Sequence, residues 1–161
     1  MDRQEDNGLI RHREPVQSAW IDYNGHMNVA YYVLAFDHAT DVVLDALGLG
    51  AAYADESGMS IFVADMHVAY RREVHAGDML RFESRLLDFD DKRIHIFHTM
   101  FGGKSADPAA TNEIMCVHVD LDSRRPVALP PARRTAVEAL WKAQSGLEAP
   151  AGVGRVIESL R

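Results

Sequence analysis

The sequence predicts an α+β domain in which one long helix is wrapped by a curved antiparallel sheet of five to six strands, followed by a C-terminal helix. The order of the elements supports this, because a strand and a long helix precede four strand-like runs without intervening helices. Those runs are separated by hairpin-length turns, which favours antiparallel pairing. The length of 161 residues fits one domain and is too short for a (β/α)8 barrel, which needs about 200 residues or more.

The first half of the chain predicts a strand over residues 14–21 and a helix that begins at Val29. In the helical stretch, apolar residues recur at three- and four-residue spacing while aspartates occupy the other side. Its length corresponds to about five turns, and Gly48 and Gly50 end it.

The second half predicts four strands with alternating apolar residues over 59–72, 79–89, 92–101 and 111–122. A second helix is expected over 132–144, after a proline-rich turn. The sequence thus divides into a polar, flexible arm (1–12), one domain (13–131), and a C-terminal helix with a mobile tail (132–161), without an internal repeat.

Composition excludes several classes of protein. There are 17 basic and 24 acidic side chains, a formal charge of −7, which argues against a general nucleic-acid binder. The single cysteine, Cys116, excludes an internal disulfide and a multi-cysteine zinc site. No apolar run approaches the ~20 residues of a membrane span, and the charged start is unlike a signal peptide. We therefore expect a cytoplasmic protein that does not bind membranes.

A dense polar cluster lies where the first predicted strand meets the long helix. A helix N-terminus offers unpaired N–H groups that can stabilise an oxyanion. Within the cluster, Asp22 can serve as base or nucleophile and His26 can transfer protons, while Asn24 and Asn28 can position water or a carbonyl. Capping is the competing explanation, because Asn28 stands at the N-cap position. Four such residues together exceed what one helix start needs.

The string Asp-Tyr-Asn-Gly-His-Met-Asn (22–28), followed by a tyrosine-containing helix, resembles the active-site loop of hotdog-fold acyl-CoA thioesterases of the 4-hydroxybenzoyl-CoA thioesterase-like group. Further similar segments follow at 70–78, 90–98 and 110–115, and the resemblance spans roughly residues 14–131. Within this group the combination is most similar to the betainyl-CoA thioesterases, which accompany carnitine breakdown.

The resemblance implies a hotdog fold, no metal, and no cofactor beyond the coenzyme A thioester that is the substrate. It also implies a homodimer whose sheets join edge to edge, with active sites between subunits; a tetramer built as a dimer of dimers is the further option. Asp22 matches the catalytic carboxylate of the Asp-x-x-Gly motif. The group's 4-hydroxybenzoyl enzyme has apolar residues after the glycine, so the His26 and Asn28 of this chain leave open whether Asp22 acts alone.

The expected reaction is hydrolysis of a short polar acyl-CoA such as betainyl-CoA to the free acid and CoA. The amides of Gly25 and His26 are expected to stabilise the oxyanion while Asp22 activates water or attacks directly. The alternatives are hydrolysis of another acyl-CoA or of acyl carrier protein, a dehydratase on the same fold, and a non-catalytic acyl-CoA-binding protein.

Several residues are candidates for substrate binding, each with a structural alternative. Aromatic side chains near the loop can hold a quaternary ammonium group or can simply be core. Asp65 and His67 can line an inter-subunit site or can bond to neighbours. No histidine has metal-ligand spacing, and Cys116 is expected to be a small buried side chain. The substrate-binding candidates are Gly25, Tyr23, Met27, Tyr31, Tyr32, Asp65, His67 and Arg71.

Overall fold

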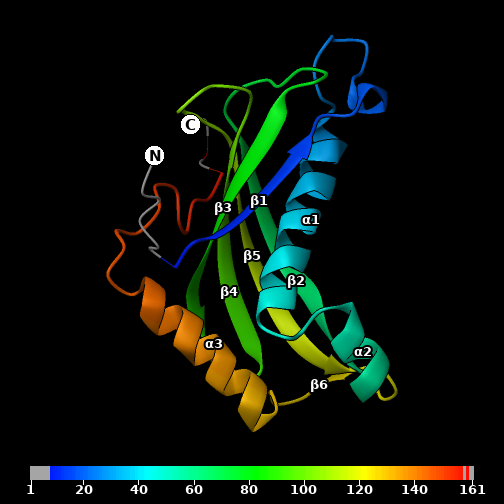
Figure 1. The fold of residues 1–161 in the computed structure, drawn as a ribbon, viewed down its shortest axis with the longest axis vertical. Helices are drawn as coiled ribbons and strands as arrows, with labels where there is room; N and C mark the ends of the chain where they lie inside the picture. Colours follow the sequence, from blue (N-terminus) through cyan, green and yellow to red (C-terminus); the bar gives the residue numbers. More distant parts are fainter. Residues whose placement is uncertain (1–7, 158, 160–161) are drawn as a thin grey trace, which may run out of the picture.

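The computed structural model describes residues 8–157 and 159, and it confirms the α+β class. The strands pair antiparallel throughout in the order β1-β3-β4-β5-β2, with β6 added beside β5 (Figure 1). The helices and strands are β1 (Ile10–Pro15), a 3-10 turn (Ser18–Trp20), α1 (Val29–Ala46), α2 (Ala51–Ser57), β2 (Met59–Tyr70), β3 (Met79–Phe89), β4 (Arg93–Phe101), β5 (Pro108–Asp120), β6 (Arg125–Pro126) and α3 (Pro131–Gln144).

Helix α1 lies along the inner face of the curved sheet, and its apolar stripe builds the core. One apolar cluster surrounds Phe36 near the start of α1, and a second surrounds Val43 near its end. A polar row separates the two, formed by Thr40 on α1 with Ser84 and His98 on the strands below it. The core is therefore divided into two apolar halves by a buried layer of hydrogen bonds.

The hydrogen bonds in this layer fix the tautomer of His98. The Thr40 hydroxyl donates its one hydrogen to the Phe36 carbonyl (3.0 Å), so it must accept from His98 Nε2–H (3.1 Å). The unprotonated Nδ1 then accepts from the Ser84 hydroxyl, 2.7 Å away. Complete burial lowers the pKa of His98 to about 3, so the imidazole is neutral in the folded protein at physiological pH.

Helix α3 occupies the part of the β3 edge that β1 leaves open. Strand β1 pairs only with residues 79–84 of β3. Beyond that point the Leu86 N–H donates to the buried Gln144 side chain (2.8 Å), and Trp141 Nε1–H donates to the Leu87 carbonyl (3.1 Å). Side chains of α3 therefore satisfy backbone groups that a longer strand would have paired.

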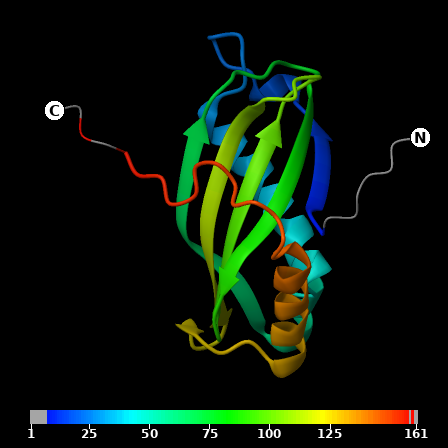
Figure 2. The same cartoon turned by 90° about the vertical axis from the view of Figure 1, so that its left-hand side faces the viewer.

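The segment after α3 crosses the outer face of the sheet, opposite α1 (Figure 2). The Arg85 guanidinium on β3 donates to the carbonyls of Gln144, Leu147 and Glu148. Further along, the Gly154 N–H donates to the Glu113 carboxylate (2.7 Å). The mobility predicted for this tail stays a prediction, but its described part is hydrogen-bonded along the sheet.

Several predicted boundaries were wrong. The first strand runs over Ile10–Pro15 and not over 14–21, so residues 10–12, which were predicted to belong to the arm, lie in a strand; residues 1–7 lie outside the described part. Strand β1 is polar because it lies at the sheet edge, whereas the apolar Val16 and Trp20 are buried in the turn that follows. The fifth strand begins at Pro108, and the short α2 and β6 were missed.

A β-bulge in β2 changes which side chains face the core. The pairing of β2 with β5 shifts register between Val63 and Asp65. Before the bulge Ile61 packs into the core, and after it Met66 and Val68 do so, although strict alternation would place residues 61 and 66 on opposite faces.

Among the described helices, none is long and apolar enough to cross a membrane.

Candidate active site

The polar cluster of the sequence forms a tight hairpin-like loop at the N-terminus of α1. Ile21 and Met27 form a β-bridge, and the Gly25 N–H donates to the Asp22 carbonyl (3.0 Å). Gly25 has φ = 82°, a left-handed conformation that glycine adopts without strain. Met27 is buried, and its N–H donates to the Val74 carbonyl (2.9 Å), which fixes the loop to the segment after β2.

The Asp22 carboxylate is held by two donors in this loop. Oδ1 accepts from the Asn24 N–H (2.8 Å), and Oδ2 accepts from Asn28 Nδ2 (2.9 Å). These hydrogen bonds, the backbone one from Asn24 foremost, and the nearby His26 lower the pKa of Asp22 below its usual value. The carboxylate is therefore ionised and oriented at neutral pH.

Asn28 combines the two roles that the sequence left open. Its Oδ1 accepts from the Ala30 N–H (3.0 Å), which makes it the N-cap of α1, while its Nδ2 orients Asp22. Capping and positioning of the carboxylate thus use different atoms of one side chain.

The loop leaves one predicted oxyanion donor available. The Gly25 N–H is already used within the turn, contrary to its expected role, whereas the His26 N–H has no hydrogen-bond partner in the described chain. The His26 ring donates from Nδ1 to the Met27 carbonyl (3.3 Å), and its Nε2 lies 3.6 Å from the Glu73 carboxylate. His26 therefore offers a free amide on one side and a ring facing an acid on the other.

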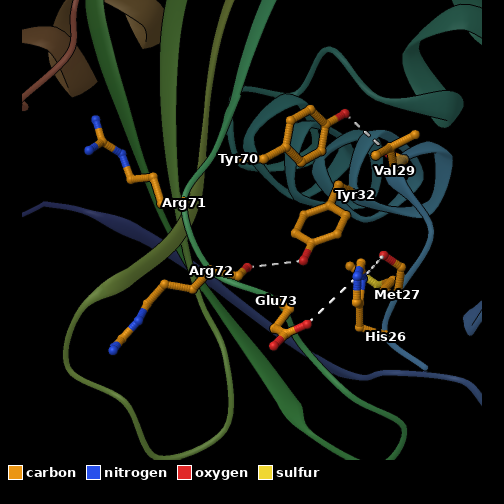
Figure 3. Close-up of a pocket in the computed structure, with 8 residues that line it drawn as sticks. All are labelled: His26, Met27, Val29, Tyr32, Tyr70, Arg71, Arg72 and Glu73. Carbon is orange, nitrogen blue, oxygen red and sulfur yellow. Dashed lines mark hydrogen bonds and ion pairs between the residues drawn. The ribbon is translucent and has the colours of Figure 1, made fainter. Parts of the chain in front are cut away.

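A cavity of about 560 Å³ opens between the start of α1 and the end of β2 (Figure 3). Tyr32 and Tyr70 form its aromatic wall, with ring centroids 5.1 Å apart in an edge-to-face arrangement. The Tyr32 hydroxyl donates to the Arg72 carbonyl (3.1 Å), and the Tyr70 hydroxyl donates to the Val29 carbonyl (3.2 Å). The lining residues are His26, Met27, Val29, Tyr32, Tyr70, Arg71, Arg72 and Glu73.

Four of the predicted site residues line this cavity, namely His26, Met27, Tyr32 and Arg71, and five substrate-binding candidates lie outside it. Tyr23 is 97% exposed on the loop, and Tyr31 stacks on Trp20 with ring centroids 5.5 Å apart. Asp65 and His67 line a separate cavity of about 350 Å³ on the outer face of the sheet. Asp22, Asn24, Gly25 and Asn28 do not line the 560 Å³ cavity themselves but belong to the loop that borders it.

Tyr70 was missed from the sequence, whereas Glu73 was already a candidate for placing negative charge near a cationic acyl group, with an ordinary surface position as the alternative. Tyr70 and Glu73 lie at the end of β2, some 40 residues from the loop, and only the sheet brings them to it. The signal that could have found Tyr70 is the segment 70–78, which was already one of the similar stretches.

The histidines on β4 and β5 (His95, His98 and His118) have hydrogen-bond partners and are not arranged around a metal. In the sequence His95 has no carboxylate partner at metal-ligand spacing, but the fold places Glu113 of the neighbouring strand 2.8 Å from its ring. Cys116 is buried as expected, and burial raises the pKa of its thiol to about 12. Within the described residues, no group of three or more His, Cys, Asp or Glu side chains is arranged to hold a metal ion. The absence of a metal requirement stays a prediction.

Residues 16–137 match the family model of the thioesterase-like superfamily. The chain belongs to this superfamily. This thioesterase-like chain is 38% identical over 149 residues to the betainyl-CoA thioesterase of Pseudomonas aeruginosa, covering 92% of this chain and 94% of that protein. It is also 38% identical over 138 residues to the L-carnitine dehydrogenase/betainyl-CoA thioesterase of Ruegeria pomeroyi, where the match covers 86% of this chain but 28% of the longer relative.

A solved structure shows the same architecture with its ligand bound. A Staphylococcus aureus protein in complex with CoA superposes on this thioesterase-like chain with a TM-score of 0.87 and 28% identity, covering 94% of this chain and 95% of that one. The long helix against a curved antiparallel sheet is thus the hotdog fold that the sequence predicted.

Proposed function

We propose that this protein is an acyl-CoA thioesterase that hydrolyses betainyl-CoA to betaine and CoA. The observation that carries the proposal is the Asp22 carboxylate, oriented by two hydrogen bonds at the N-cap of α1 and bordering a cavity. The relatives named for betainyl-CoA hydrolysis support the substrate, because one of them aligns over nearly its whole length.

In the proposed reaction, the thioester carbonyl lies against the start of α1, where the His26 N–H donates to the developing oxyanion. Water adds its oxygen to the carbonyl carbon as Asp22 accepts the proton. The C–S bond then breaks, and the thiolate leaves and takes up a proton. The alternative first step is attack by Asp22 itself, which gives a mixed anhydride that water cleaves. Single-turnover hydrolysis in H₂¹⁸O tests for the anhydride, because ¹⁸O enters the Asp22 side chain only if an anhydride forms and water attacks its aspartyl carbonyl.

The edge strand β2 supports a homodimer. In the sheet order β1-β3-β4-β5-β2, one edge of β2 pairs with β5 and the other has no partner in the described chain. Phe62 and Val63 on this strand are 42% and 40% exposed. A long, exposed, apolar edge strand favours pairing with a strand of a second chain. A dimeric mass by light scattering supports this proposal, a tetrameric mass supports the dimer of dimers, and a monomer at assay concentration overturns it.

The proposal also places the protein in carnitine metabolism in the cytoplasm, and it requires no cofactor other than the CoA thioester. The link to carnitine metabolism is supported by the relatives that join this activity to L-carnitine dehydrogenase in one chain.

The test of the proposed function is thiol release from betainyl-, acetyl-, aromatic and long-chain acyl-CoA, with Asp22→Asn as the variant. We expect betainyl-CoA to be hydrolysed best and Asp22→Asn to lose activity by about 100-fold or more. Asp55→Asn, an exposed aspartate on α2, is the control and should retain activity. Full activity of Asp22→Asn refutes the mechanism, and absence of hydrolysis of every thioester identifies a binding protein.

A further inference from the structure

We propose that Tyr70 and Glu73 form a subsite that selects a cationic acyl group, with the trimethylammonium group lying on the Tyr70 ring and facing the Glu73 carboxylate. This inference rests on the proposed function and deepens it, because it assigns the choice of acyl group to two residues at the end of β2.

The Tyr70 ring is held in a fixed position and is also exposed to the cavity. Its hydroxyl donates to the Val29 carbonyl at the first residue of α1, and its ring packs roughly perpendicular to the ring of the buried Tyr32. Tyr70 is nevertheless 47% exposed and lines the cavity beside the catalytic loop. A quaternary ammonium group cannot donate hydrogen bonds, so an aromatic face held in place is the protein surface that binds it best.

Charge is separated across the cavity. Figure 3 shows Glu73 on the same side as Tyr32, Tyr70 and His26, whereas the Arg71 and Arg72 side chains point away from that side. Arg72 is also paired with Asp107 (2.9 Å) and Ser105 (2.8 Å). The arginine side chains therefore lie away from the acidic and aromatic side, where the His26 Nε2 is 3.6 Å from the Glu73 carboxylate.

This arrangement matches the charges of the proposed substrate. The acyl end of betainyl-CoA is cationic and its nucleotide end is anionic, so an acid on one side of the cavity and arginines on the other favour a single orientation. A neutral acyl group gains nothing from Glu73, because the carboxylate would lose part of its hydration without receiving a counter-charge.

The experiment compares betainyl-CoA with 3,3-dimethylbutyryl-CoA, in which carbon replaces the quaternary nitrogen at nearly constant shape. The readout is the ratio of kcat/KM for the cationic substrate to that for the neutral one. The ratio cancels any loss of folded enzyme, since both substrates are measured on the same preparation. We expect a ratio above 10 for the wild type.

Four variants test the two residues. Glu73→Gln should lower the ratio by about 10-fold, and Tyr70→Leu by about 3- to 30-fold, the range of a cation–π contact. Tyr70→Phe keeps the ring and should keep the ratio, while Glu56→Gln, an exposed glutamate on α2, should leave it unchanged.

The outcomes separate this inference from the proposed function. If the wild type hydrolyses both substrates equally, or if Glu73→Gln and Tyr70→Leu leave the ratio unchanged, the subsite is wrong and the thioesterase stands. If the wild type hydrolyses neither substrate, the proposed function itself fails.

Discussion

The buried His98 should make the stability of this protein depend on pH in a measurable way. The perturbation is His98→Gln, which keeps a neutral side chain able to bond to Ser84 and Thr40 but removes the titratable group. In the folded protein the pKa of His98 is lowered to about 3, whereas in the unfolded chain it has its ordinary value near 6.5. Between these values the unfolded chain binds a proton that the folded protein does not.

The sign and the size follow from that difference. Stability is fully present above pH 6.5 and is lost as the pH falls toward 3, because protonation favours the unfolded chain. At pH 4.5, two units below the unfolded pKa, the loss is about 3 kcal/mol at ~1.4 kcal/mol per unit. That is a large share of the 5–15 kcal/mol that is typical of a folded domain.

The assay is urea-induced unfolding at pH 7.5 and pH 4.5 at one protein concentration. We expect the stability of the wild type, relative to His98→Gln, to fall by about 3 kcal/mol between the two pH values. His75→Gln is the control, because the His75 side chain is 57% exposed and should give no such difference. An unchanged difference between wild type and His98→Gln would refute the assignment of a neutral buried imidazole.

Two further predictions concern the loop and the packing beside it. Asn28→Ala should lower the free energy of unfolding by about 1 kcal/mol and slow hydrolysis, while Asn28→Ser should restore most of the stability, both measured by denaturation alongside thiol release. Gly102→Ala would place a Cβ 2.3 Å from a methyl group of the buried Val74 and should cost about 1–3 kcal/mol, whereas Gly146→Ala, with no atom within 4 Å, should cost nothing measurable in the same assay.

The parts of the structure that were predictable are those determined by local sequence. The 3.6-residue period located α1, and the Asp-Tyr-Asn-Gly string located the loop before it. Both signals lie within a few residues of the structure that they specify, so no knowledge of distant contacts was needed.

The parts that were not predictable depend on contacts between distant segments. Strand β1 has one large apolar residue, Ile10, and is a strand because it pairs with β3. Strict alternation along β2 would place Asp65 and His67 on the same face as Ile61, but the bulge after Val63 turns the second half of β2 over. Alternation in one sequence cannot reveal such a bulge, because it depends on the pairing with β5.

The path of the tail beyond α3 depends on a side chain of β3 that binds the tail's backbone. Arg85 binds the tail through the backbone carbonyls of Leu147 and Glu148 and binds the last residue of α3 through the Gln144 carbonyl, and every residue type carries a carbonyl. The residues that supply these carbonyls can therefore change in evolution without loss of the contact, whereas a change at Arg85 removes all three hydrogen bonds. Among relatives, the conformation of this tail should follow the residue at position 85 more closely than the sequence of the tail itself.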